Sequence, residues 1–227
     1  MNKILIYIIA LSLFLFFSCK QENNTSNETQ IKPVDNQQNS SIDTFKTRRI
    51  NVDNILRNPE VIINKSKRTL SVYSDSNLVG YYKIALGLNP TSDKIKTGDF
   101  ATPECTFYIC SNNSRSKYHL SLLISYPNKE YADRGLKSKL ISQNEYNQII
   151  NAINNMKTPP QNTNLGGDIC IHGGGTNSNW TFGCIALEDK DIEDLFKFIQ
   201  LGTKITIIHS PTSSSQVELG NSQNNAY

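Results

Sequence analysis

One stretch of the chain combines a histidine, a cysteine and glycines in an order that suits covalent catalysis. Residues 170–187 read Cys-Ile-His-Gly-Gly-Gly-Thr-Asn-Ser-Asn-Trp-Thr-Phe-Gly-Cys-Ile-Ala-Leu. A short apolar run leads to His172, and Cys184 stands directly before a second apolar run. The thiolate is the nucleophilic form of cysteine, and a neighbouring imidazole can take the thiol proton. We therefore interpret Cys184 as a nucleophile and His172 as its general base, which later becomes the acid for the leaving group.

Two glycines beside this pair have expected backbone roles. The amide groups of Gly183 and Cys184 are placed to form an oxyanion hole, which stabilises the charge that develops on an attacked carbonyl. The carbonyl of Gly173 is expected to orient the imidazole. Glycine also lets the backbone approach a substrate closely and adopt positive φ angles.

Three further residues are candidates for substrate contacts, and each also has a purely structural interpretation. Thr181 either contacts the reacting groups or caps its own turn with its hydroxyl. Trp180 is either a platform for the substrate or an anchor of the loop. His119, on an expected strand, is either a substrate contact or a structural histidine.

A structural zinc site is the alternative to catalysis at this stretch. Cys170, His172 and Cys184 would supply three ligands and His119 a fourth. Their spacing is irregular for such a site, so we expect no metal and no other cofactor. Nor does the sequence predict a particular disulfide, since outside the candidate nucleophile and the N-terminal region three cysteines leave an odd one: Cys105, Cys110 and Cys170.

Expected elements must position the candidate residues within one α+β domain. Alternating polar and apolar residues predict a hairpin of residues 68–73 and 79–88 around a turn at 75–77. Capping residues and apolar spacing predict two helices, at 142–156 and 189–201. Irregular alternation of strands and helices favours a curved mixed sheet or sandwich over a doubly wound fold. Further strands are expected at 106–110, 118–125, 168–172 and 204–209.

The chain ends differ in composition from this domain. Residues 1–18 carry Lys3 and an apolar run of signal-peptide length, and Phe-Phe-Ser-Cys at 16–19 resembles a lipoprotein lipobox, which predicts lipidation of Cys19. An uncleaved membrane anchor is the alternative. Residues 19–56 and 210–227 are poor in apolar residues, so we expect a disordered tether and tail around a domain at 57–209.

The charge of the chain argues against nucleic acid as a partner. The formal net charge of its 227 residues is only +3. Lys and Arg are moderately frequent between residues 65 and 96, which a solvated surface explains. A nucleic-acid-binding face would need a stronger concentration of these residues.

The central stretch resembles the active-site signature of L,D-transpeptidase catalytic domains, the YkuD-like family. The resemblance lies in Ile-His-Gly at 171–173 and in Trp-Thr-Phe-Gly-Cys-Ile-Ala-Leu at 180–187. Residues 68–73 resemble the opening strand of that family, and Tyr-His-Leu-Ser-Leu at 118–122 with Ser-Tyr-Pro-Asn at 125–128 resembles its YafK-like branch. The similarity extends over residues 60–209.

The sequence departs from the commonest form of this signature at two positions. Directly before Gly-Cys, the commonest signature has His and this chain has Phe182. Two residues after the Cys, the commonest signature has Arg and this chain has Ala186. Cys105 also replaces a glycine that usually follows Thr-Pro-Glu. We interpret the first two departures as marks of the branch.

The resemblance implies a lipid-anchored enzyme of the cell envelope that faces the periplasm. Cys184 would attack a peptidoglycan stem peptide during cell-wall biogenesis, form a thioester and pass the acyl group to an amine. Hydrolysis of the same class of bond is the nearest alternative. A non-enzymatic peptidoglycan-binding module and a zinc-stabilised envelope domain are the others.

Overall fold

The computed structural model describes residues 46–51 and 55–209, which lie within one compact unit of the chain. The predicted signal peptide, Cys19 and the tail 210–227 lie outside the described residues. The described part contains no helix that is both long and apolar enough to cross a bilayer. It forms eight strands: β1 Glu60–Asn64, β2 Thr69–Ser74, β3 Asn77–Lys83, β4 Cys105–Ser116, β5 His119–Ile124, β6 Cys170–His172, β7 Ile185–Ala186 and β8 Lys204–Ile208.

The strands form a mixed sheet in the order β3-β2-β1-β8-β4-β5-β6-β7. The long strand β4 pairs with β8 through its first residues and with β5 through later ones. Irregular register between Ile109 and Ser111 marks this change of partner, as expected where a bulge bends a strand. The predicted hairpin is confirmed as β2 and β3, which pair antiparallel.

The two ends of the strand order meet, so the sheet is strongly curved. Ala85, just after β3, exchanges two backbone hydrogen bonds of 2.9 Å with Ala186 of β7. A further bridge joins Gly87 to Thr181. The expected curved mixed sheet is therefore confirmed, and its two ends meet close to the candidate nucleophile, Cys184.

The inward faces of the strands form the hydrophobic core. Side chains alternate between faces along a strand, and β1 and β8 bury alternate residues in this way. Burial of such side chains contributes roughly 1.5–3 kcal/mol each. The core includes Val61, Ile63, Leu70, Val72, Leu122, Ile124, Ile171, Ile185, Ile205 and Ile207.

Residues 55–209 form three helices, where the sequence predicted two. The predicted helices are α2 Gln143–Asn154, which begins with a capping box at Ser142 and Glu145, and α3 Asp189–Phe198. The additional helix, α1 Lys129–Lys137, is capped by Asn128, whose side chain accepts a hydrogen bond from Tyr131 N–H. It has only nine residues and contains a glycine, so its sequence signal is weak.

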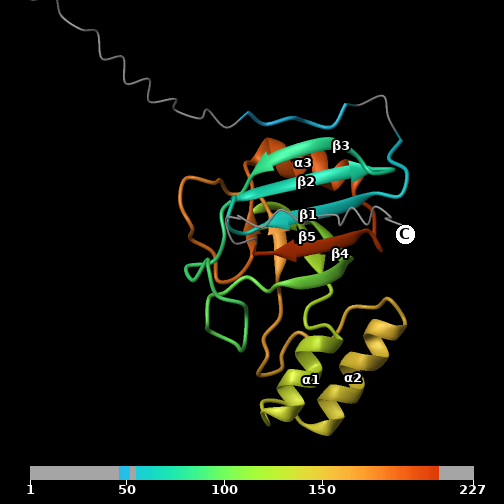
Figure 1. Ribbon diagram of the computed structural model, residues 1–227, viewed down its shortest axis with the longest axis vertical. Coiled ribbons are helices and arrows are strands. Elements are labelled where there is room, and N and C mark those ends of the chain that lie inside the picture. Colours follow the sequence, from blue (N-terminus) through green and yellow to red (C-terminus); the bar gives the residue numbers. More distant parts are fainter. Residues whose placement is uncertain (1–45, 52–54, 210–227) are drawn as a thin grey trace, which may run out of the picture. The chain divides into compact units, whose positions relative to one another are not determined.

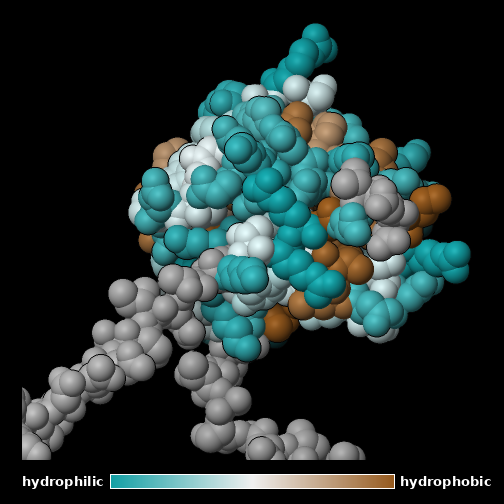
Figure 2. Space-filling model, turned by 90° about the horizontal axis from the view of Figure 1, so that it is seen from above, coloured by the Kyte–Doolittle hydropathy of each residue, from teal (hydrophilic) through white to brown (hydrophobic). Residues whose placement is uncertain are grey.

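The helices lie at two places on the domain. Figure 1 shows α1 and α2 side by side at one end of the domain, whereas α3 packs against β5 and β6. The face seen from the side of β3 and α3 is mainly hydrophilic, with small hydrophobic patches (Figure 2). Helix α3 buries Ile192 and Leu195, in keeping with its predicted apolar stripe.

The folded domain begins earlier than the sequence predicted. Residues 46–51, expected to belong to the tether, lie against the sheet. Arg48 and Tyr81 exchange two backbone hydrogen bonds of 2.8 Å, Arg49 forms an ion pair with Asp191 at 3.0 Å, and Ile50 is buried. One apolar residue in a polar segment gives little periodicity, which is why the tether prediction was wrong here.

Candidate active site

Strand pairing brings the two ends of the candidate stretch together. Strands β6 and β7 are parallel neighbours, with Ile171 opposite Ile185. Cys170 and Cys184 each precede these residues by one position, and the Cys170 N–H donates to Cys184 Sγ at 3.4 Å. Alternate residues of a strand share a face, so Cys170 and His172 both lie on the side of Cys184. The predicted cysteine–histidine pair is thus assembled by two adjacent strands.

The imidazole of His172 is buried and held from several sides. Its Nδ1 lies 2.6 Å from the carbonyl oxygen of Gly173, as predicted, and since a carbonyl only accepts, Nδ1 carries a proton. The ring stacks on Tyr118 with centroids 4.6 Å apart and meets Trp180 edge-on at 5.5 Å. Trp180 is itself fixed by a hydrogen bond from Nε1 to Gly175 O. In the neutral tautomer these contacts leave Nε2 as the basic nitrogen.

The Cys184 thiol lies among groups that favour its ionised form. Donation from the Cys170 thiol is the largest influence on the pKa of Cys184. Burial opposes ionisation, but hydrogen bonding and positive charge from His172 act with Cys170 to hold that pKa well below its usual range. The protonated thiol has an alternative partner, the carbonyl of Asp168, which accepts from Sγ at 3.3 Å. The site therefore supports both protonation states of the nucleophile.

The turn before the nucleophile requires a glycine. Gly183 has φ of +126°, and a Cβ there would lie 2.8 Å from the carbonyl oxygen of Ala101. Thr181 Oγ1 donates to Cys184 O at 2.7 Å and accepts from Gly183 N–H at 3.3 Å. These bonds fit the turn-capping interpretation of Thr181, which also lines the cavity. Gly183 N–H, expected as an oxyanion donor, is directed to this hydroxyl.

A cavity of about 580 Å³ opens over the pair. Its wall carries both polar and aromatic groups, and Lys117 supplies a cation that lies 4.8 Å from the Tyr118 ring centroid. An elongated, polar substrate with carboxylate groups would find both a cation and apolar surface here. The lining includes Ser116, Lys117, Tyr118, Ser121, Asp168, Cys170, His172, Trp180, Thr181, Phe182 and Cys184.

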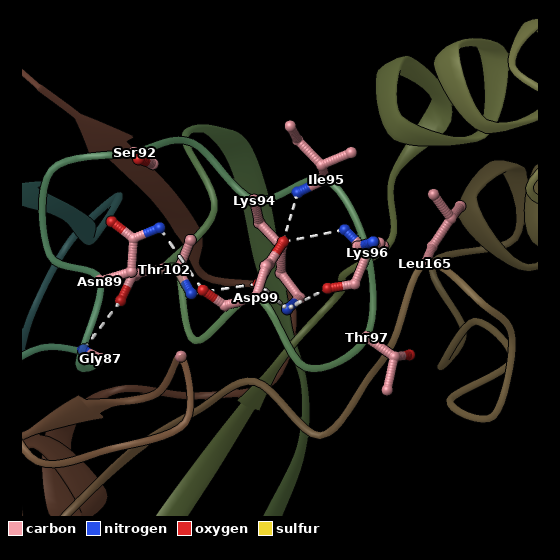
Figure 3. Close-up of polar contacts among 12 residues, drawn as sticks. Gly87, Asn89, Ser92, Lys94, Ile95, Lys96, Thr97, Asp99, Thr102 and Leu165 are labelled. Carbon is pink, nitrogen blue, oxygen red and sulfur yellow. Dashed lines mark hydrogen bonds and ion pairs between the residues drawn. The ribbon is translucent and has the colours of Figure 1, made fainter.

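The loop between β3 and β4 forms a wall beside the nucleophile turn and is organised by Asp99 (Figure 3). Burial opposes ionisation of Asp99, but hydrogen bonds lower its pKa below the usual range. The donors are Lys94 Nζ at 2.8 Å and backbone amides that include those of Ile95 and Lys96 at 2.7 and 2.8 Å. This arrangement fixes the loop segment that contacts Gly183.

The two departures from the commonest signature have different surroundings. Ala186 is fully buried in the pairing with Ala85, where a longer side chain would have no space. Phe182 is 73% exposed at the cavity rim, and its ring centroid lies 5.2 Å from that of Phe100. Position 186 is therefore structural in this chain, whereas position 182 adds aromatic surface to the cavity.

His119 is not brought into the cavity. Its Nε2 lies 2.8 Å from a carboxylate oxygen of Glu193 on α3, so the structural interpretation fits its position. Because His119 contacts Glu193, a zinc site at this stretch would lack its fourth ligand. In the described part of the chain, no three His, Cys, Asp or Glu side chains are grouped in a way that could hold a metal ion.

Sequence reasoning missed Tyr118 and Lys117 as neighbours of the imidazole. Tyr118 reaches His172 only because β5 pairs with β6, and its carbonyl accepts from Gly173 N–H at 3.1 Å. No local pattern reports such a pairing. Cys170 did carry a signal, because it stands two residues before His172 and so shares its face of the strand.

Solved structures offer distant similarities. Pgp2 from Campylobacter jejuni, titled a helical cell shape determining protein, shares 22% identity at a TM-score of 0.45, covering 70% of this chain and 50% of that one. Bd1075 from Bdellovibrio bacteriovorus shares 20% sequence identity at a TM-score of 0.43, and the match covers 72% of this chain and 52% of that one. An L,D-transpeptidase from Xylanimonas cellulosilytica shares 14% sequence identity at a TM-score of 0.42, and the match covers 67% of this chain and 61% of that one. This chain spans about half the length of the first two.

The comparison with protein families is decisive. Comparison with curated protein sequences finds no significant match. The family model for the YkuD L,D-transpeptidase catalytic domain matches residues 58–207, which is well over half of the chain and includes β1 to β7 and all but the last residue of β8. The chain therefore belongs to the L,D-transpeptidase catalytic domain family.

Proposed function

We propose that this protein is a cysteine-dependent L,D-transpeptidase that acts on peptidoglycan stem peptides. The observation that carries the proposal is the position of the Cys184 thiol between Cys170 and His172 in an open cavity. A buried structural cysteine would need neither a lowered pKa nor access from solvent.

Acylation would begin when His172 Nε2 takes the thiol proton. The Cys184 thiolate then attacks the carbonyl carbon between the L-centre of a diamino acid and the terminal D-residue. The C–N bond breaks, the leaving amine takes the proton back from His172, and a thioester remains. General acid–base help of this kind contributes about 10²–10⁴-fold in rate.

The Cys184 backbone amide is the proposed oxyanion donor. Gly183 N–H would contribute as a second donor only by releasing Thr181 Oγ1, at 3.3 Å. One such donor contributes roughly 2.7–4 kcal/mol to transition-state stabilisation where it has been measured. Lys117, at the cavity wall, would attract the carboxylate of the terminal D-residue.

Deacylation would complete the reaction when an amine of a second stem peptide attacks the thioester. His172 would accept the proton from that amine, and the thiolate would leave. Water in place of the amine would give hydrolysis, the same chemistry with a different acceptor. Anchoring through a lipid on Cys19, which would hold the domain in the cell envelope and facing the periplasm, stays a prediction.

Incubation with tetrapeptide muropeptides tests the proposal. Mass spectrometry should detect cross-linked dimers with the parent chain and none with Cys184→Ala. Cys105→Ala, which removes a half-buried thiol whose partners are Asn128 and Glu130, is the matched control and should retain the activity. Trimmed monomers alone would assign a hydrolase. Binding to sacculi that persists in Cys184→Ala, with no product from the parent chain, would favour a binding module.

A further inference from the structure

The position of Cys170 beside Cys184 has no part in the acyl transfer itself. The register of β6 and β7 pairs Ile171 with Ile185, so the cysteines one residue earlier on each strand lie beside one another, and Cys170 N–H donates to Cys184 Sγ at 3.4 Å. Neighbouring strands lie roughly 4.8 Å apart. Disulfides join Cα atoms that are typically about 4.4–6.8 Å apart, so the backbone already has a spacing at which a bond between the two sulfurs can form.

Both thiols are free and line the same open cavity, so a small oxidant can reach them. Their hydrogen bond makes them chemically unequal. The pKa of Cys184 is lowered, whereas that of Cys170 is raised, first by its hydrogen bond to Cys184 and then by burial. The thiolate is the form that reacts with peroxides, which selects Cys184 for the first oxidation.

We propose that Cys170 and Cys184 form an oxidative modification site, in which a hydroperoxide oxidises Cys184 and Cys170 then closes a reversible disulfide with it. The Cys184 thiolate attacks the terminal peroxide oxygen, the O–O bond breaks, and the departing alkoxide or hydroxide takes a proton. Cys184 is now a sulfenic acid. Cys170 sulfur attacks Cys184 sulfur, the S–O bond breaks, and the hydroxyl leaves with the Cys170 proton as water.

The protonation states of the two thiols set the order of these steps. Cys170 is held protonated by the thiolate it donates to. Oxidation of Cys184 to a neutral sulfenic acid removes that charge, so Cys170 becomes easier to ionise only when it is needed. Without a neighbouring thiol, a sulfenic acid can oxidise further to sulfinic and sulfonic acids, which reductants such as dithiothreitol do not reverse. The disulfide would switch the nucleophile off and preserve it.

The sequence makes the product simple to observe. Trypsin cuts after Lys and Arg, and the chain has none between Lys157 and Lys190. Cys170 and Cys184 therefore fall on one peptide, residues 158–190, which contains no other cysteine. An internal disulfide would make this peptide two hydrogens lighter and block alkylation of both thiols.

The experiment treats the reduced full chain with equimolar to tenfold hydrogen peroxide, alkylates remaining thiols with N-ethylmaleimide and maps the peptides. We expect the lighter peptide in the parent chain, with alkylation of both thiols restored by dithiothreitol. In Cys170→Ser, Cys184 should appear as sulfinic or sulfonic acid, with at least tenfold less recovered by reductant. Cys105→Ser, the matched control at a half-buried thiol outside the cavity, should behave as the parent.

Two results would overturn the proposal. One is equal irreversible oxidation of Cys184 in parent and Cys170→Ser, with no lighter peptide. The other is a cross-link of Cys170 to Cys110 that leaves Cys184 open to alkylation. The parent measurement needs no variant to fold and no substrate, so its outcome is independent of the muropeptide assay.

Discussion

Cys184 and Cys105 are both cysteines, but their surroundings shift the pKa of the thiol in opposite directions. Both are partly buried and free. Cys105, at the start of β4, has a raised pKa because of burial and because its thiol donates to a carboxylate oxygen of Glu130 at 3.2 Å. At Cys184 the Asp168 carbonyl also accepts from the thiol, but hydrogen bonds from Cys170 and His172 outweigh burial, and its pKa is lowered instead.

Burial raises the pKa of both thiols, so the difference between the nucleophile and the inert thiol comes from their hydrogen-bond partners. The partners of Cys184 come from the pairing of β6 with β7, whereas those of Cys105 come from the start of α1.

Removal of the nucleophile should have the largest effect. We expect Cys184→Ala to lower the rate of muropeptide transfer by at least ~10³-fold, as loss of a covalent nucleophile does elsewhere. Cys105→Ala should stay within about twofold of the parent, because no group of the cavity contacts it. Comparable losses in both variants, measured by product mass spectrometry, would remove the distinction.

Removal of the base should be nearly as damaging. His172→Gln keeps a polar side chain but cannot supply the proton transfers, so acylation should slow about 10²–10⁴-fold. The pH at which Cys184 is half-alkylated by iodoacetamide should also rise, because the imidazole no longer favours the thiolate. An unchanged alkylation profile would assign His172 a structural role.

The pH dependence of alkylation compares the two thiols within one chain. A lowered pKa makes the thiolate fraction of Cys184 at neutral pH larger than that of an ordinary thiol, and its reactivity should fall as the pH drops through that lowered value. Cys105 should react appreciably only above the usual range of thiols. We expect at least tenfold faster modification of Cys184 at pH 7, read by peptide mapping, and equal rates would contradict the account.

Loss of the turn cap should have a moderate effect on both stability and activity. Thr181→Val removes the hydroxyl that joins Cys184 O to Gly183 N–H, and an unsatisfied buried polar group costs about 1–3 kcal/mol. Denaturant unfolding should show this loss, with slower acylation because the turn is less well held. Thr181→Ser restores the hydroxyl and should recover most of both.

The smallest effect is expected far from either thiol. Ser142→Ala deletes the cap of α2 and should lower the free energy of unfolding by about 1 kcal/mol. Acylation of Cys184 should be unchanged, because α2 does not line the cavity. A change in acylation would show that the helical end of the domain is coupled to the site.

Local patterns in the sequence predicted much of the fold. The hairpin β2–β3 follows from alternation around a turn, and α2 follows from its capping box and apolar spacing. Strand β1 was missed although it pairs with the neighbouring β2 as well as with the distant β8, because its short apolar run at residues 61–63 does not alternate. Helix α1 was missed because one cap and nine residues give little periodicity.

The candidate pair was visible in the sequence, but its surroundings were not. Glycines and apolar runs around Cys184 and His172 indicate two strand ends, and strand alternation places Cys170 on the face of His172. The stacking of Tyr118 and the capture of Gly183 N–H by Thr181 depend on tertiary packing. Such contacts follow from which strands pair, and short sequence windows do not encode that.

Exposure of the folded chain to a carbapenem, followed by intact-mass measurement and fragmentation of peptide 158–190, tests the central claim most directly. A carbapenem carries a strained acyl group that an activated thiolate opens to a stable thioester. The account predicts one adduct per chain, located on Cys184 and absent from Cys184→Ala. A folded parent chain with no adduct, or with the adduct on Cys170, would contradict it.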